Sequence, residues 1–284
     1  MKQLFCTLMV LATFTGFSQN TDDVTPQKYT AHNKGKFYIF WGGNRDSYSK
    51  SDIHFTGNNY DFTVQDAVAD DKPKGWHIDY INPSRMTIPQ TNLRIGYFIT
   101  DKYNVSIGVD HMKYVMRQNQ VANVSGYVNL PASDAGSTHN GFYANNPKVL
   151  TEDFLTFEHT DGLNYINAEF SRVADLSKFI GLRNTDKFQI NLTEGIGAGI
   201  IYPKTNAKLL GKDRHDDFNV AGFGASVKAG LNFTFFKYFF VQTELKGGYI
   251  NMNNIKTTAS NADKATQKFC FFETVIAVGG IFRI

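Results

Sequence analysis

The chain is poor in cysteine, in proline and in long apolar runs, and each shortage excludes a class of protein. It has 2 cysteines and 7 prolines among 284 residues. Cys6 falls in an expected leader, so Cys270 has no partner for an internal disulfide, and a disulfide-stapled domain is excluded. We interpret Cys270 as an apolar strand residue, with a reactive thiol as the alternative. No segment after the leader is long and apolar enough for a membrane helix.

An excess of charge is also missing. The formal net charge is +3, from 29 Lys and Arg against 26 Asp and Glu. No basic cluster follows one face of a segment, so a nucleic-acid partner is excluded. The sequence shows no P-loop, no dinucleotide fingerprint and no nucleophile elbow, and we expect no cofactor. His54, His77, His139 and His215 lack metal-ligand spacing, and we expect no metal site.

The first residues predict export. Lys2 precedes an apolar stretch over residues 4–17, which is too short to span a membrane, and Ser18 and Gln19 follow as a cleavage-like end. We therefore expect a signal peptide over residues 1–19, a periplasmic segment over 20–35 and one barrel domain over 36–284.

Aromatic residues and glycine are abundant. The chain has 25 Phe, 14 Tyr and 24 Gly, yet its mean hydropathy is only −0.31. A water-soluble protein would bury so many aromatics in a core. A membrane barrel instead spreads them over an outer apolar band and keeps its lumen and loops polar.

Strict alternation of apolar and polar residues is the strongest pattern. Over residues 221–235 one face carries Phe223, Val227 and Leu231, and the other carries small or polar residues such as Ser226 and Asn232. Similar alternation covers 188–202, 92–116 and 267–283. A soluble sandwich is the alternative, but its strands are usually about half as long. We predict an all-β fold, a transmembrane antiparallel up-and-down β-barrel of about eight strands.

The connection lengths predict the topology, because outer-membrane barrels keep short turns and both termini on the periplasmic side. The turns near 101–103 and 236–237 should be periplasmic. The predicted strands are 36–48, 90–100, 104–118, 163–176, 187–202, 219–235, 237–252 and 267–283. The predicted surface loops are 49–89, 119–162, 203–218 and 253–266, with 153–159 as an extracellular hairpin. Ten strands are the alternative, with a hairpin supplied by residues 53–68.

Three segments carry a resemblance to a known class. Residues 36–45 (KFYIFWGGNR), 108–115 (GVDHMKYV) and 157–164 (FEHTDGLN) resemble those of outer-membrane barrels from environmental Gram-negative bacteria. Nearly everything after residue 34 is similar to the small eight-stranded class that includes the OmpA-like and OmpX-like barrels. The resemblance implies the cell outer membrane as location and implies no particular activity.

Charged residues are expected inside the barrel. Our register points three cations and four carboxylates inward, namely Arg94, Lys228, Lys246, Asp110, Glu169, Glu244 and Glu273. An unpaired buried charge is costly, so we expect a salt-bridged plug, with a proton or ion path as the alternative. A barrel of this size has no room for a wide pore.

The candidate catalytic residues lie at a predicted extracellular strand tip. Glu158, His159 and Asp161 bring a carboxylate, an imidazole and a second carboxylate within four positions, which suits activation of water. The segment also resembles the His-x-Ser-Asn element of lipid A deacylases, with His159 as base and Asp161 where that element has serine. The alternatives are a polar turn built on Asp161 and Gly162, which we favour, and a metal site.

Two further candidates fall on the apolar face of their strands. His111 and Glu194 would face lipid near the middle of the wall, which is unfavourable for a charged group. We expect a β-bulge at Glu194 and Gly195 that turns Glu194 inward; a lipid-facing active site is the alternative.

These observations favour a non-enzymatic outer-membrane protein for surface interaction, envelope integrity or complex assembly. The alternatives are an outer-leaflet lipid hydrolase and a narrow or gated small-solute transporter. Expected partners are outer-membrane lipids and a protein of the envelope.

Overall fold

The computed structural model describes residues 33–75, 89–182, 184–215 and 217–284. The expected signal peptide lies outside these residues, as does most of the expected periplasmic segment. Within the described part no helix is long and apolar enough to cross a membrane. The described helix is the short 3₁₀ segment η3 (Ala135–His139).

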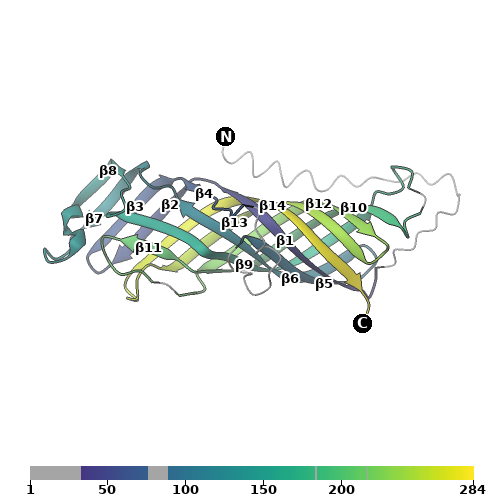
Figure 1. The fold of residues 1–284 in the computed structure, drawn as a ribbon. Helices are drawn as coiled ribbons and strands as arrows, with labels where there is room; N and C mark the ends of the chain where they lie inside the picture. The colour runs from purple at the N-terminus through teal and green to yellow at the C-terminus, as the bar shows by residue number, and fades with distance from the viewer. Residues whose placement is uncertain (1–32, 76–88, 183, 216) are drawn as a thin grey trace.

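Eight antiparallel strands form the wall of a barrel (Figure 1). They are β1 (Phe37–Tyr48), β5 (Thr91–Phe98), β6 (Tyr103–Met116), β9 (Leu155–Asp175), β10 (Phe188–Pro203), β12 (Gly222–Phe235), β13 (Phe239–Lys256) and β14 (Lys264–Phe282). Each pairs with its neighbour in this order, and β14 also pairs with β1 from Phe37↔Phe282 to Tyr48↔Phe271. The last strand is thereby joined to the first. The predicted all-β architecture and the count of eight wall strands are confirmed.

Alternate residues of every wall strand point outward. These outward residues make the outer face of the wall apolar. Ile107 is 69% exposed, Ile196 62% and Ile276 59%, on three different strands. Aromatic residues gather at the end with the short turns, where the Tyr103 and Phe170 rings stack 5.6 Å apart. An apolar band with aromatic residues at its rim is the surface that a membrane barrel presents to lipid.

Short turns mark one end of the barrel. β12 and β13 are joined by a tight turn in which Phe236 and Lys237 have positive φ, and β5 and β6 are joined through residues 99–102. The C-terminus lies at this same end (Figure 1). By the rule for outer-membrane barrels this end is periplasmic, as the sequence predicts.

At the opposite, extracellular end the structure has strands where the sequence predicted polar loops. The segments predicted as loops 49–89 and 119–162 contain β2 (Ser51–Gly57), β3 (Tyr60–Ala67), β7 (Val121–Val128) and β8 (Gly141–Val149), which continue the wall in the order β14-β2-β3-β7-β8. Two short strands, β4 (Ala69–Asp70) and β11 (Asn206–Leu209), pair with β6 and β9. The hairpin of the ten-strand alternative exists as β2 and β3, but it extends the wall outside the band.

The predicted hairpin at 153–159 is also corrected. Leu155 to His159 belong to β9 itself, which begins eight residues earlier than predicted. This extension pairs with β6 on one side, where Glu158 lies opposite Val115, and with β11 on the other. A polar stretch continues as a strand here because both neighbours supply backbone partners.

A hydrophobic core, like that of a water-soluble protein, fills the extracellular extension. Side chains from the strands of the extension and from the upper ends of wall strands pack together, and Phe55, Phe62 and Phe157 are at most 1% exposed. The Phe55 and Phe62 ring centroids lie 5.3 Å apart, and those of Phe55 and Phe157 lie 5.6 Å apart. The extension is therefore held by aromatic packing rather than by lipid.

Candidate functional site

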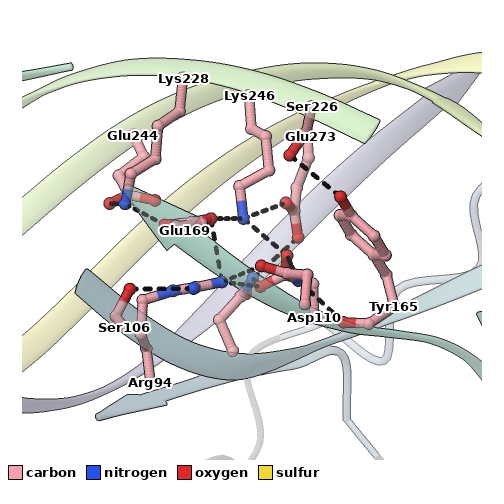
Figure 2. Close-up of polar contacts among 12 residues, drawn as sticks. Arg94, Ser106, Asp110, Tyr165, Glu169, Ser226, Lys228, Glu244, Lys246 and Glu273 are labelled. Atoms are coloured by element: carbon pink, nitrogen blue, oxygen red, sulfur yellow. Dashed lines mark hydrogen bonds and ion pairs between the residues drawn. The ribbon is translucent and has the colours of Figure 1, made fainter. Parts of the chain in front are cut away.

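A buried charged network lies inside the barrel (Figure 2). All seven charged residues that the alternation pointed inward are inside: Arg94, Asp110, Glu169, Lys228, Glu244, Lys246 and Glu273. They come from six strands, β5, β6, β9, β12, β13 and β14. Their side chains are nearly inaccessible to solvent, so the predicted inward register is confirmed.

The ammonium group of Lys246 lies at the centre of this network. Its Nζ lies 2.6 Å from Asp110 Oδ2, 3.1 Å from Glu169 Oε1 and 3.6 Å from Glu273 Oε2. The ammonium thus faces carboxylates from three different strands, which Figure 2 shows converging on it. Because the site is buried, these ion pairs are screened far less than surface pairs.

Glu169 connects Lys246 with the other two cations. Arg94 Nη2 lies 3.0 Å from Glu169 Oε1, and Lys228 Nζ lies 2.7 Å from Glu169 Oε2. Lys228 also donates to Glu244 Oε1 at 2.7 Å. One carboxylate therefore contacts all three cations, which makes the network a single unit rather than separate pairs.

Two amides, Asn92 and Asn167, join the network around Asp110, and the sequence analysis did not assign them. Asn92 Nδ2 donates to Asp110 Oδ1 at 2.8 Å and to Glu273 Oε1 at 2.9 Å. Asn167 Nδ2 donates to Asp110 Oδ2 at 3.0 Å, and its Oδ1 accepts from Arg94 at 2.8 Å. Both lie two residues from a network charge on the same strand face, which is the signal that could have identified them.

The arrangement fills the lumen with paired charges. Three cations face four carboxylates, and amides donate further hydrogen bonds to the carboxylate oxygens. Lys246 of β13 contacts Asp110 of β6 and Glu169 of β9 across the barrel, so the network ties opposite walls together. This is the plug that the sequence predicts, and it lies across the path that a solute would take.

A bulge in β9 separates Asp161 from the adjacent candidates Glu158 and His159. Met112 pairs with Leu163 and Tyr114 pairs with His159, so one residue of β6 lies opposite three residues of β9, 160–162. Gly162 has φ +145° within this bulge. The sequence Asp161–Gly162 therefore forms a bulge in a continuous strand, and the predicted hairpin turn is wrong.

Alternation along β9 places His159 inside and Glu158 outside, and Asp161 within the bulge is also outside. His159 is fully buried against Phe157, with ring centroids 4.9 Å apart, and its Nδ1 lies 3.0 Å from Thr205 Oγ1. Glu158 accepts a hydrogen bond from Asn206 at 3.0 Å, and Asp161 lies 3.5 Å from Lys204. The structure does not bring the imidazole and the carboxylates together as a base and its partner.

His159 lies above the apolar band in the extension of β9. Burial lowers the pKa of His159 to about 3, even though Gln267 acts in the opposite direction. The imidazole is therefore neutral at physiological pH. Its aromatic neighbours make it a packing residue of the extracellular core.

Glu194 keeps the outward register that the alternation indicates, whereas His111 is buried. β10 runs without a register shift past Glu194, so the predicted bulge there is wrong. Glu194 lies opposite Arg172 of β9, and their charged atoms are 3.8 Å apart. His111 is 5% exposed, with Nδ1 2.7 Å from Asn164 Oδ1. The two residues lie on different strand pairs and form no common site.

Among the residues that the structure describes, no group of three or more His, Cys, Asp or Glu is arranged to hold a metal ion. Cys270 is half-buried in β14 and makes no disulfide.

Comparisons with known proteins bear on the fold. No protein-family model matches the chain, and no curated protein sequence matches it. Similar solved structures include the outer membrane protein AlkL, at 8% identity over 93% of this chain and 98% of that chain, with a TM-score of 0.38. OprG from Pseudomonas aeruginosa shares 10% identity over 89% and 99%, with a TM-score of 0.36. Ail, the attachment invasion locus protein of Yersinia pestis, shares 12% identity over 88% and 99%, with a TM-score of 0.31.

The chain has the fold of the small outer-membrane β-barrels, and its location is the outer membrane. This rests on its own ring of eight wall strands, its apolar band and its short periplasmic turns. The likeness to the solved structures concerns the fold and carries no activity with it.

Proposed function

We propose that the chain is a non-enzymatic outer-membrane protein whose extracellular sheet binds a protein partner. The observation that carries this proposal is an exposed apolar face on β7 and β8, outside the membrane band. Val121 is 66% exposed, Tyr127 44%, Phe142 77% and Val149 47%. Exposed apolar patches of this kind mark interaction sites on soluble surfaces.

The strand register explains why these four residues share a face. Val121 pairs with Val149, and Tyr127 pairs with Phe142, so two apolar cross-strand pairs lie on one side of the ribbon. The opposite side carries Val124, which is buried in the aromatic core. The ribbon thus buries its inner face in the core, whereas its outer apolar face stays exposed and open to a partner.

The face, rather than the edge, of β8 is the docking surface. Among the described strands β8 pairs with β7 alone. Pro147 has no N–H to offer at that edge, Asn145 has φ +60° at a register shift, and Lys148 adds charge. These are the features by which proteins protect an edge strand from unwanted pairing.

The interior and the predicted catalytic residues support the same choice. The charged network and the aromatic core fill the lumen, which favours neither a diffusion channel nor a wide pore. His159 is buried and neutral, and Glu158 and Asp161 point away from it, which does not favour a hydrolase. Outer-membrane lipids are the second proposed partner, through contact of acyl chains with the apolar band.

Site-specific photocrosslinking in intact cells tests the proposal. A photoreactive residue at Phe142 or Tyr127 should form one discrete protein adduct, which mass spectrometry identifies. The control position is Glu152, whose side chain is 68% exposed at the same end of the molecule. Phe142→Ser should abolish the adduct formed from Val121 and weaken binding of the purified partner by at least about tenfold, as hot-spot aromatics do.

Two outcomes would contradict the proposal. Adducts of equal yield at Phe142 and Glu152 would indicate random encounter with neighbouring proteins. A change in lipid A mass in cells that express the wild type, lost in His159→Ala, would favour the lipid hydrolase instead.

A further inference from the structure

A small polar cavity lies in the barrel between the charged network and the periplasmic end. Its volume is about 40 Å³. Amides and hydroxyls such as Asn191, Thr193 and Gln242 line it beside apolar side chains such as Phe98 and Phe240, with Lys36 and Lys237 as the lining cations nearest the periplasm. A cavity of this size holds a few water molecules or the head of a small ion, and it is too small for a sugar or a nucleotide.

The lining is unbalanced in charge. Three lysines line the cavity, and among the described residues none of the lining side chains is a carboxylate. At the deep end, Lys228 is neutralised because it is paired with Glu169 and Glu244. The excess positive charge therefore lies at the periplasmic end.

Lys36 is the least compensated of these cations. Burial lowers the pKa of Lys36, and the nearby charges of Arg283 and Lys237 lower it further, against an opposing effect of Asp101. Lys237 has an ion pair with Asp186, 3.2 Å away. An anion beside Lys36 would reduce the repulsion between these cations.

Two buried hydroxyls supply an independent observation. Ser171 and Thr193 are 4% and 5% exposed, and both line the cavity. Their hydroxyl oxygens make no hydrogen bond with another described group. A buried hydroxyl without a partner is unfavourable, and both can donate to an acceptor in the cavity.

We propose that this periplasmic cavity is a binding site for a small oxyanion, held by Lys36 and Lys237 and by the hydroxyls of Ser171 and Thr193. The ligand class follows from the lining, which offers ammonium, hydroxyl and amide donors to an acceptor-only group of a few atoms. Carboxylate and phosphate groups have this chemistry. The site is independent of the extracellular face formed by β7 and β8.

The experiment is a titration of the full mature chain, folded in lipid nanodiscs, with sodium acetate and with sodium phosphate at constant ionic strength. Amide resonances of Asn191 and Thr193 should shift in a saturable manner in the millimolar range. Resonances of Val121, at the extracellular end, should not move. A shift that does not saturate, or that is equal at both ends, would overturn the proposal.

Matched lysine variants separate a built site from general attraction to a basic surface. Lys36→Gln should weaken binding by about tenfold or more, since charge-assisted hydrogen bonds contribute on that scale. Lys34→Gln removes an equally charged neighbour that does not line the cavity, and it should leave the affinity within about twofold. Equal loss in both variants would overturn the proposal. Lys237→Gln is the second test should Lys36→Gln fail to fold.

Discussion

Replacing the central ammonium of the charged network should be among the most destabilising substitutions in the barrel. In Lys246→Met, three carboxylates lose a cation that lies 2.6, 3.1 and 3.6 Å from their oxygens. Glu169 keeps Arg94 and Lys228, whereas Glu273 is left with the amide of Asn92 as its hydrogen-bond donor.

The expected loss of stability follows from the position of Glu273, which is left without a cation. Breaking a buried ion pair by removing one partner costs about 3–5 kcal/mol, because a charge is left uncompensated. That corresponds to roughly 10²–10⁴-fold in the folding equilibrium constant, at about 1.4 kcal/mol per tenfold. Adding Glu273→Gln to Lys246→Met should recover part of this loss, since the amide carries no charge.

The assay is reversible denaturant unfolding of the barrel in lipid vesicles, followed by tryptophan fluorescence. The matched control is Lys208→Met, which removes an exposed ammonium paired with Glu152 and should change stability by less than about 1 kcal/mol. If folded Lys246→Met lay within about 1 kcal/mol of the wild type, the network would not stabilise the barrel as argued.

Three further predictions concern the wall and the extracellular end. A spin label at Ile196 should be reached by a lipid-soluble quencher, and one at Asn191 should be shielded; equal access would contradict the register. His159→Ala should destabilise the folded chain by about 2–4 kcal/mol in the same denaturant assay, because it opens a cavity in an aromatic core. Burial raises the pKa of Asp263, but hydrogen bonds from Lys212 and Thr258 outweigh it and hold that pKa below its usual range. Asp263 therefore contributes stability above the pKa of the unfolded carboxyl, about 3.9, and the contribution is lost as pH falls through its folded pKa. Asp263→Asn should be destabilised at pH 7, and the difference from the wild type should shrink in acid; a pH-independent difference would contradict this.

The wall strands were predictable because lipid on one side and a narrow lumen on the other enforce strict alternation. That pattern also identified every charge of the network. Of the extracellular sheet only the hairpin at 53–68 was foreseen, as the ten-strand alternative, because the strands are short and their core joins residues far apart in the chain. The rule of an even strand count applies to strands that cross the membrane, and the strands of the extracellular sheet do not cross it.

Details that depend on a neighbouring strand were not predictable. Asp161–Gly162 suits a hairpin turn and a bulge equally, and the pairing of β6 with β9 decides between them. Alternation within β10 places Glu194 on the outer face, but its partner Arg172 is on β9, which no pattern within β10 reveals.

The pairing of β14 links the order of folding to what the cell surface displays. One edge of β14 holds β1 through residues 271–282 and then β2 through residues 264–267, so β2 continues β1 along the same strand. Ile53 finds its partner Gln267 far along the chain. Such distant pairings are slow to form, even though longer loops add little to their thermodynamic cost. The strand that joins the two ends of the wall, β14, therefore also pairs with the sheet that carries Tyr127 and Phe142. A chain that lacks β14 neither completes its barrel nor presents this face.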